Sequence, residues 1–193
     1  MCNSKRTVDI PEEFYSYATG QLFDKCIDCE KWLLEEGTEY FIEKAIKQYD
    51  GFSAKEVIFE YAICADCADT VRKSISKQSM NDIEKFFFEN IDFQRRMEVM
   101  RSNPKNPIAW ISNCLISNSS IQKMPEYQIF AHCSGKALNL SQMPYMVSGN
   151  VLEQVQHLLS PETKDELNDF MERNLGPSPE LAEILPGSRV VFI

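Results

Sequence analysis

Two Cys-x-x-Cys pairs constrain the fold of this chain more than any other feature of its sequence. The first pair is Cys26 and Cys29, and the second is Cys64 and Cys67. Each pair can occupy one edge of a tetrahedron, and Zn²⁺ binds four thiolates at about 2.3 Å in closed structural sites. The sequence therefore predicts that these four cysteines bind one structural zinc ion per chain.

The residues between the two pairs predict a β-hairpin. Residues 39–47 alternate in part between apolar and polar side chains, and residues 57–63 place their largest apolar side chains on one face. β-Branched and aromatic residues are frequent in both segments, which favours strands. After the second pair, Ala68, Val71 and Ile75 recur at helical spacing, so we expect a helix to begin there.

This order of knuckle, hairpin and helix resembles a treble-clef zinc finger, over roughly residues 20–80. In that resemblance Cys26 and Cys29 are the knuckle ligands, and Cys64 and Cys67 are the ligands at the start of the helix. The chain is also similar to uncharacterised bacterial proteins with two CxxC motifs. The resemblance implies that zinc is a folding element, but it implies no particular activity. A nuclease of this family would need a histidine on the hairpin, and this hairpin has none.

Iron–sulfur ligation and thiol redox switching are the alternatives for the four thiols. A thioredoxin-like site uses one Cys-x-x-Cys pair beside a βαβ pattern, which fits two pairs that flank a hairpin poorly. Four thiolates also close the coordination shell, whereas a catalytic zinc keeps one position for water. We therefore expect a metal that is structural and a protein that is not an enzyme at this site.

The compartment follows from what the sequence lacks. The N-terminal residues lead into no apolar run, and no uninterrupted apolar stretch approaches the roughly 18 residues of a membrane span. In a reducing compartment, paired cysteines are metal ligands more often than disulfides. We expect a soluble, cytoplasmic protein without a membrane partner.

Charge is distributed unevenly around a net value of −9. Residues 1–71 hold 7 Lys and Arg against 15 Asp and Glu, whereas residues 72–105 hold 8 against 5. Binding to duplex nucleic acid needs cations that displace phosphate counterions, which the acidic N-terminal part lacks. The charge therefore favours another protein as the partner. A nucleic-acid-associated regulator that uses the basic stretch 72–101 is the alternative.

A proline- and asparagine-rich break at residues 103–107 predicts a boundary. Before it, residues 14–102 form the zinc-binding module with its following helix. After it, residues 108–193 form an α+β part, with a strand at 126–133 and a closing strand at 189–193. The sequence leaves open whether the two parts share one core.

A second group of reactive side chains lies in the C-terminal part, at Cys114, His132 and Cys133. Neighbours on a strand point to opposite faces, so His132 and Cys133 are badly placed to act together. Free cysteines are common core residues, and we favour core packing for all three. The alternative is an enzyme or thiol redox switch with its site near these residues.

Together these observations predict an α+β fold, with an N-terminal treble-clef-like zinc module and a mainly helical C-terminal part that has a few strands. The function that fits best is a non-catalytic structural-zinc-binding protein that acts as a protein-interaction or regulatory module. The sequence names neither the partner nor the oligomeric state.

Overall fold

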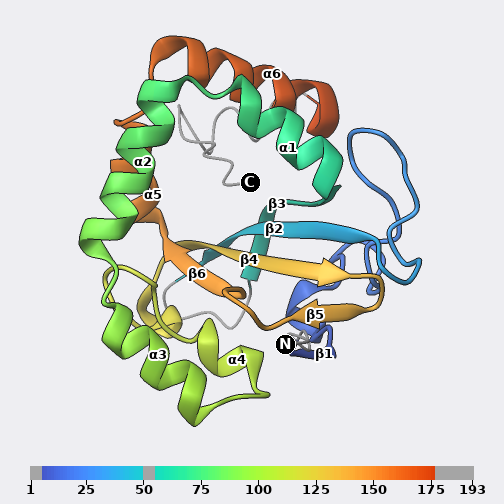
Figure 1. Ribbon diagram of the computed structural model, residues 1–193, viewed down its shortest axis with the longest axis vertical. Helices are drawn as coiled ribbons and strands as arrows, with labels where there is room; N and C mark the ends of the chain where they lie inside the picture. The colour runs from blue at the N-terminus through green and yellow to red at the C-terminus, as the bar shows by residue number, and fades with distance from the viewer. Residues whose placement is uncertain (1–5, 50–54, 177–193) are drawn as a thin grey trace, which may run out of the picture.

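The computed structural model describes residues 6–49 and 55–176, and within them the chain forms a mixed α/β fold around one antiparallel sheet (Figure 1). The strands are β1 (Thr7–Asp9), β2 (Glu39–Gln48), β3 (Lys55–Cys64), β4 (Glu126–Ser134), β5 (Ala137–Asn139) and β6 (Tyr145–Ser148). The helices are α1 (Ala65–Ser74), α2 (Lys77–Asn90), α3 (Phe93–Ser102), α4 (Pro107–Trp110), α5 (Gly149–Gln156) and α6 (Pro161–Leu175). Short 3₁₀ helices are η1 (Glu12–Phe14) and η2 (Ile121–Lys123).

The predicted hairpin is confirmed. β2 and β3 pair from Tyr40 opposite Cys64 to Gln48 opposite Lys55, with a bulge after Ala45. β3 passes directly into α1, which begins at Ala65. The second cysteine pair therefore lies where the edge strand becomes a helix.

The two sequence segments expected at 14–102 and 108–193 share this sheet. β4 lies beside β2 in antiparallel register, from Glu39 opposite Ser134 to Lys47 opposite Glu126. The other edge of β4 pairs with β6 along its first half and with β5 along its second half, and β1 adds to β5. The strand order is β1-β5-β4-β2-β3, with β6 attached to β4.

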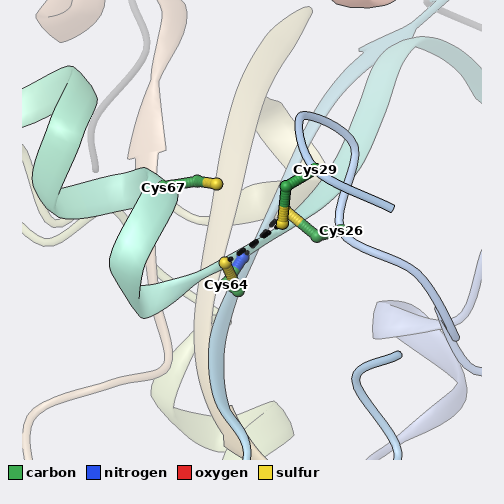
Figure 2. A group of neighbouring side chains, drawn as sticks. All are labelled: Cys26, Cys29, Cys64 and Cys67. Carbon is green, nitrogen blue, oxygen red and sulfur yellow. Dashed lines mark hydrogen bonds between the residues drawn. The ribbon is translucent and has the colours of Figure 1, made fainter. Parts of the chain in front are cut away.

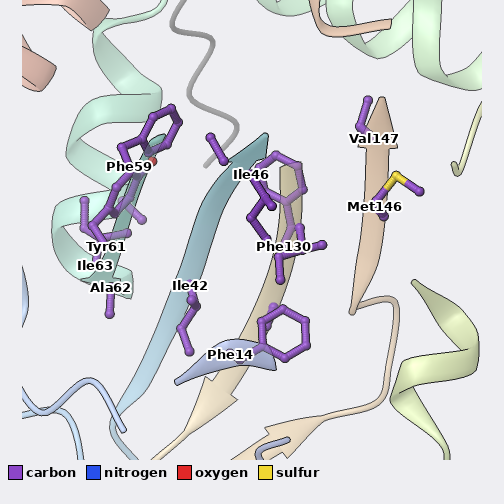
Figure 3. Close-up of a cluster of buried hydrophobic side chains, with 14 of the residues drawn as sticks. Phe14, Ile42, Ile46, Phe59, Tyr61, Ala62, Ile63, Phe130, Met146 and Val147 are labelled. Carbon is purple, nitrogen blue, oxygen red and sulfur yellow. The ribbon is translucent and has the colours of Figure 1, made fainter. Parts of the chain in front are cut away.

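The buried side chains of both segments form one hydrophobic core. Figure 3 shows side chains of β2, β3, β4 and β6 gathering there together with Phe14 of η1. Helices lie at opposite ends of the sheet in Figure 1: α1 packs beside α6 at the top of the view, and α3 beside α4 at the bottom. A single core of this kind couples the packing of the cysteine-bearing hairpin to that of the C-terminal strands.

Serine residues stand at the N-caps of two helices in the C-terminal part. Ser148 lies at the N-cap of α5, and Ser160 caps α6 by accepting a hydrogen bond from the amide of Thr163. The closing strand expected at 189–193 lies outside the described residues. In the described ranges, no helix is both long enough and apolar enough for a bilayer crossing.

Candidate metal centre

The four paired cysteines converge, as the sequence predicts. Their sulfur atoms all lie within 4.8 Å of one another. Cys26 and Cys29 come from a turn that precedes the hairpin, Cys64 is the last residue of β3, and Cys67 lies in the first turn of α1 (Figure 2). Segments nearly 40 residues apart in the chain thus meet at one point.

The turn that carries the first pair closes on itself by backbone hydrogen bonds. The amide of Cys26 donates to the carbonyl of Lys31 at 2.9 Å, and the amide of Glu30 donates back to the carbonyl of Cys26 at 3.0 Å. Glu30 adopts a positive φ of 60°, a conformation that glycine adopts at lower cost. Lys25 and Trp32 pair as an isolated antiparallel bridge at the base of the turn.

Two contacts attach this turn to the edge strand β3. The amide of Ile27 donates to the carbonyl of Ala62 at 2.9 Å, and the amide of Cys64 donates to the sulfur of Cys26 at 3.3 Å. The first contact fixes the turn beside β3. The second gives the Cys26 sulfur a donor that favours its thiolate form.

The protonation of the thiols depends on this surrounding. Burial acts to raise the pKa of Cys26, but backbone amides led by that of Cys64 outweigh it and bring the pKa below its ordinary value. Burial raises the pKa of Cys64 and of Cys67, and in Cys67 the neighbouring thiols add to the effect. Metal binding would therefore release protons from Cys64 and Cys67, as thiolate ligation generally does.

The donor set fits a soft metal ion. Four thiolates are the ligand set of Zn²⁺ and of iron–sulfur centres. A zinc–sulfur bond of about 2.3 Å gives a tetrahedron with an edge of roughly 3.8 Å, and the sulfurs of Cys29 and Cys64 lie 3.8 Å apart. Cys26 and Cys64 are buried, Cys67 is partly buried and Cys29 is exposed, so the cluster reaches the protein surface at Cys29.

The other three reactive side chains singled out in the sequence have separate partners. His132 lies 2.5 Å from a carboxylate oxygen of Glu39 and stacks on Phe41. Cys133 is fully buried, and burial raises its pKa to about 12. Cys114 lies against Ser148, with 3.6 Å between sulfur and hydroxyl. Nothing in these contacts couples Cys114 to His132 as a nucleophile to its base.

The basic stretch makes contacts within the protein. Arg96 donates to the carbonyls of Trp110, Gln142 and Pro144 at 3.1, 2.9 and 2.6 Å and lies over the Trp110 ring. Arg95 donates to the carbonyl of Leu115 at 3.0 Å. These two guanidinium groups therefore hold α3 against the loops of the C-terminal part.

A buried ion pair that the sequence patterns did not predict joins the two strands of the hairpin. Lys44 and Glu60 are opposite each other on β2 and β3, and their charged atoms lie 3.1 Å apart. Lys44 also donates to the carbonyl of Tyr15 at 2.6 Å, and Glu60 accepts from the hydroxyl of Ser16 at 3.0 Å. The position of Lys44 in the middle of a strand, between Ile42 and Ala45, was the available signal for such a partner.

Comparison of the chain with protein-family models, with curated proteins and with solved structures finds no match in any of the three. The chemistry of the four cysteines must therefore be inferred from their own geometry, which is compatible with a metal site.

Proposed function

We propose that the protein is a non-catalytic zinc protein in which one Zn²⁺ ion, bound by Cys26, Cys29, Cys64 and Cys67, stabilises the fold. The observation that carries the proposal is the approach of all four sulfurs to within 4.8 Å of one another. We further propose that residues 20–80 form a treble-clef zinc finger. The support is the order of closed turn, antiparallel hairpin and helix, with a cysteine pair at each end.

Metal content and thiol counting test this proposal. Untagged protein should contain one zinc per chain by elemental analysis. Removal of the zinc with a chelator should free four additional thiols and lower the thermal stability, because the binding free energy of structural zinc is largely folding free energy. Zinc-free protein with two disulfides would contradict the proposal and favour the redox alternative. Zinc-free protein with a coloured cluster would favour the iron–sulfur alternative.

For the partner, we propose another protein that binds an apolar surface at the junction of α2 and α3. Phe88, Phe93 and Met97 are 75%, 49% and 49% exposed, and the two phenyl rings lie 5.9 Å apart. Neighbouring aromatic side chains that stay in water are typical of protein-binding surfaces. The use of Arg95 and Arg96 within the protein weakens the case for a nucleic-acid partner.

Site-specific crosslinking tests this partner. A photoreactive amino acid at position 88 of the full chain should give one discrete crosslinked protein in living cells. The same amino acid at exposed position 136, in the turn after β4, is the control. The crosslink should disappear when Phe93→Asp and Met97→Asp are added. A crosslink to RNA or DNA would favour the nucleic-acid alternative, and an equal pattern from both positions would contradict the proposed surface.

A further inference from the structure

The turn at Cys114 repeats the turn at Cys26 in its backbone contacts. In both turns the cysteine amide donates to the carbonyl five residues later, and the amide four residues later donates back to the cysteine carbonyl. Around Cys26 these distances are 2.9 and 3.0 Å, with φ of 60° at Glu30. Around Cys114 they are again 2.9 and 3.0 Å, with φ of 58° at Asn118. Each turn also has an isolated antiparallel bridge at its base.

Both turns attach to a strand in the same way. The residue after the cysteine donates to the strand carbonyl that lies two residues before the helix cap. In the first case Ile27 donates to Ala62 at 2.9 Å, and in the second Leu115 donates to Met146 at 2.8 Å. The strands concerned are β3 and β6, and each leads directly into a helix.

The cysteine sulfurs also have equivalent donors. The amide of Cys64, the cap residue of α1, donates to the sulfur of Cys26 at 3.3 Å. The amide of Ser148, the cap residue of α5, donates to the sulfur of Cys114 at 3.4 Å. The chain from turn to helix is 4 residues shorter in the second case, because Cys26 and Cys114 differ by 88 positions and Cys64 and Ser148 by 84.

The strand registers relate the two turns and their strands by a two-fold axis. Tyr40 of β2 lies opposite the cap residue of α1, and Tyr127 of β4 lies opposite the cap residue of α5. With Tyr40 equivalent to Tyr127, Glu43 is equivalent to Phe130, and these two residues lie directly opposite each other where β2 meets β4. A two-fold axis through this pair exchanges the strand pair β2–β3 with the strand pair β4–β6.

The helices meet about the same axis. Ser76 caps α2 and Ser160 caps α6, each 12 residues after the preceding helix cap. The amide of Ser76 donates to the hydroxyl of Thr163 at 3.0 Å, and the amide of Ser160 donates to the hydroxyl of Ser79 at 2.8 Å. The hydroxyls of Ser76 and Ser160 lie 3.2 Å apart. This exchange of equivalent contacts is what two-fold symmetry requires.

We infer that the chain contains two copies of one turn–hairpin–helix unit, and that the second copy keeps the position of a metal site but has a cysteine at only one of its four ligand positions. The positions equivalent to Cys26, Cys29, Cys64 and Cys67 are Cys114, Ser117, Ser148 and Val151. Serine and valine are not among the ligands of structural zinc. The assignment of a metal position in the second copy rests on the proposed zinc site in the first copy. The repeated backbone contacts hold whether or not that zinc site exists.

Polar contacts replace the metal in the second copy. The sulfur of Cys114 accepts hydrogen bonds from the amides of Ser117 at 3.5 Å and Ser148 at 3.4 Å, and it lies 3.6 Å from the Ser148 hydroxyl. The burial of the four positions follows the first copy closely: Cys114 and Ser148 are buried like Cys26 and Cys64, and Ser117 is exposed like Cys29. The fourth position differs, because Val151 is buried whereas Cys67 is only partly buried.

Restoring the ligands tests the inference. The triple variant Ser117→Cys/Ser148→Cys/Val151→Cys should bind one zinc per chain more than the unchanged protein, measured by elemental analysis after removal of free metal. The control carries three cysteines on separate exposed segments away from this turn, as Lys105→Cys/Lys136→Cys/Gln154→Cys. It should gain no zinc. If the triple variant precipitates, the double variant Ser117→Cys/Ser148→Cys is used, and it should gain one Co²⁺ with sulfur-to-cobalt absorption bands.

The outcomes separate this inference from the proposed function. A folded triple variant with no more zinc than the unchanged protein, or a double variant without added Co²⁺, overturns the inference. Zinc contents of one and two support both proposals. Zinc contents of zero in the unchanged protein and one in the triple variant support the second site and refute the first.

Discussion

The amide of Cys64 donates a hydrogen bond to the sulfur of Cys26 across 3.3 Å, so that the last residue of an edge strand holds the first residue of the cysteine pair in the turn. The second copy makes the same contact between Ser148 and Cys114. The two sites thus differ in their side chains and not in their backbone framework. This difference allows matched comparisons within one molecule.

Cys29→Ser should abolish stoichiometric zinc binding, because serine removes one of four thiolates. The thermal midpoint should then fall to that of the chelated protein. Ser117→Ala changes the equivalent position of the second copy and is the control. It should leave the zinc content unchanged and alter the free energy of unfolding by less than about 1 kcal/mol, since Ser117 is exposed. Zinc retention by Cys29→Ser would mean that the ligand set is wrong.

Chelation should loosen the two copies unequally. The amides of Ile27 and Cys64 should exchange with solvent faster once the metal is removed, because the metal holds their turn and helix together. The amides of Leu115 and Ser148 should keep their protection, since their contacts need no metal. Residue-resolved hydrogen exchange with and without chelator measures this. Equal loss of protection at all four amides would show that the copies unfold as one unit.

Lys44→Met should destabilise the protein by about 3–5 kcal/mol, because it leaves the Glu60 carboxylate buried without its cation. The Lys44 and Glu60 side chains are only 6% and 13% exposed. The double variant Lys44→Met/Glu60→Gln should recover a large part of this loss, since it removes both charges. Urea denaturation gives both values. If the free energy of unfolding of Lys44→Met lay within about 1 kcal/mol of that of the unchanged protein, the buried Glu60 carboxylate would not need Lys44 as its cation.

Arg96→Lys should cost about 1–3 kcal/mol, because an ammonium group cannot satisfy three carbonyls and cover the Trp110 ring at once. Arg101→Lys is the control on the same helix, at an exposed position, and should change the stability by less than about 0.5 kcal/mol. Thermal unfolding of the two variants distinguishes them. Equal effects would show that the contacts of Arg96 are replaceable.

Stability should fall as the pH rises above about 10. Burial raises the pKa of Tyr127 to about 12, whereas a tyrosine of the unfolded chain ionises near 10. The unfolded state therefore loses the proton first, so the contribution is complete below pH 10 and declines by roughly 2–3 kcal/mol between pH 10 and 12. Tyr127→Phe should show a shallower decline in that window by chemical denaturation. An unchanged slope would contradict the shift.

Local sequence patterns were sufficient for the elements that build the cysteine cluster. Alternation and β-branched residues predicted β2 and β3, and the spacing of the two pairs predicted the convergence of Cys26, Cys29, Cys64 and Cys67. These patterns extend over a few neighbouring residues, so a single sequence is sufficient to recognise them.

The pairing of β2 with β4 was not predictable in the same way. Their residues are about 90 positions apart, and a strand's own pattern does not identify its neighbour. The turn at Cys114 was not predictable from the sequence, because backbone amides and carbonyls make its contacts. Its sequence resembles that of the first turn only in having a cysteine, Cys114, at the position of Cys26. Glu30 and Asn118 adopt positive φ without the glycine that would have marked either turn.

The residues at the two-fold axis limit how the halves of the chain can be recombined. Glu43 accepts a hydrogen bond from Tyr61 at 2.6 Å, whereas Phe130 packs against the ring of Tyr145, the equivalent tyrosine, at 5.1 Å. A homodimer of the first half would bring two buried carboxylates face to face at the centre of the sheet, an arrangement that like charges disfavour. The first copy therefore cannot replace the second at the axis, because Phe130 is what keeps a second carboxylate away from Glu43.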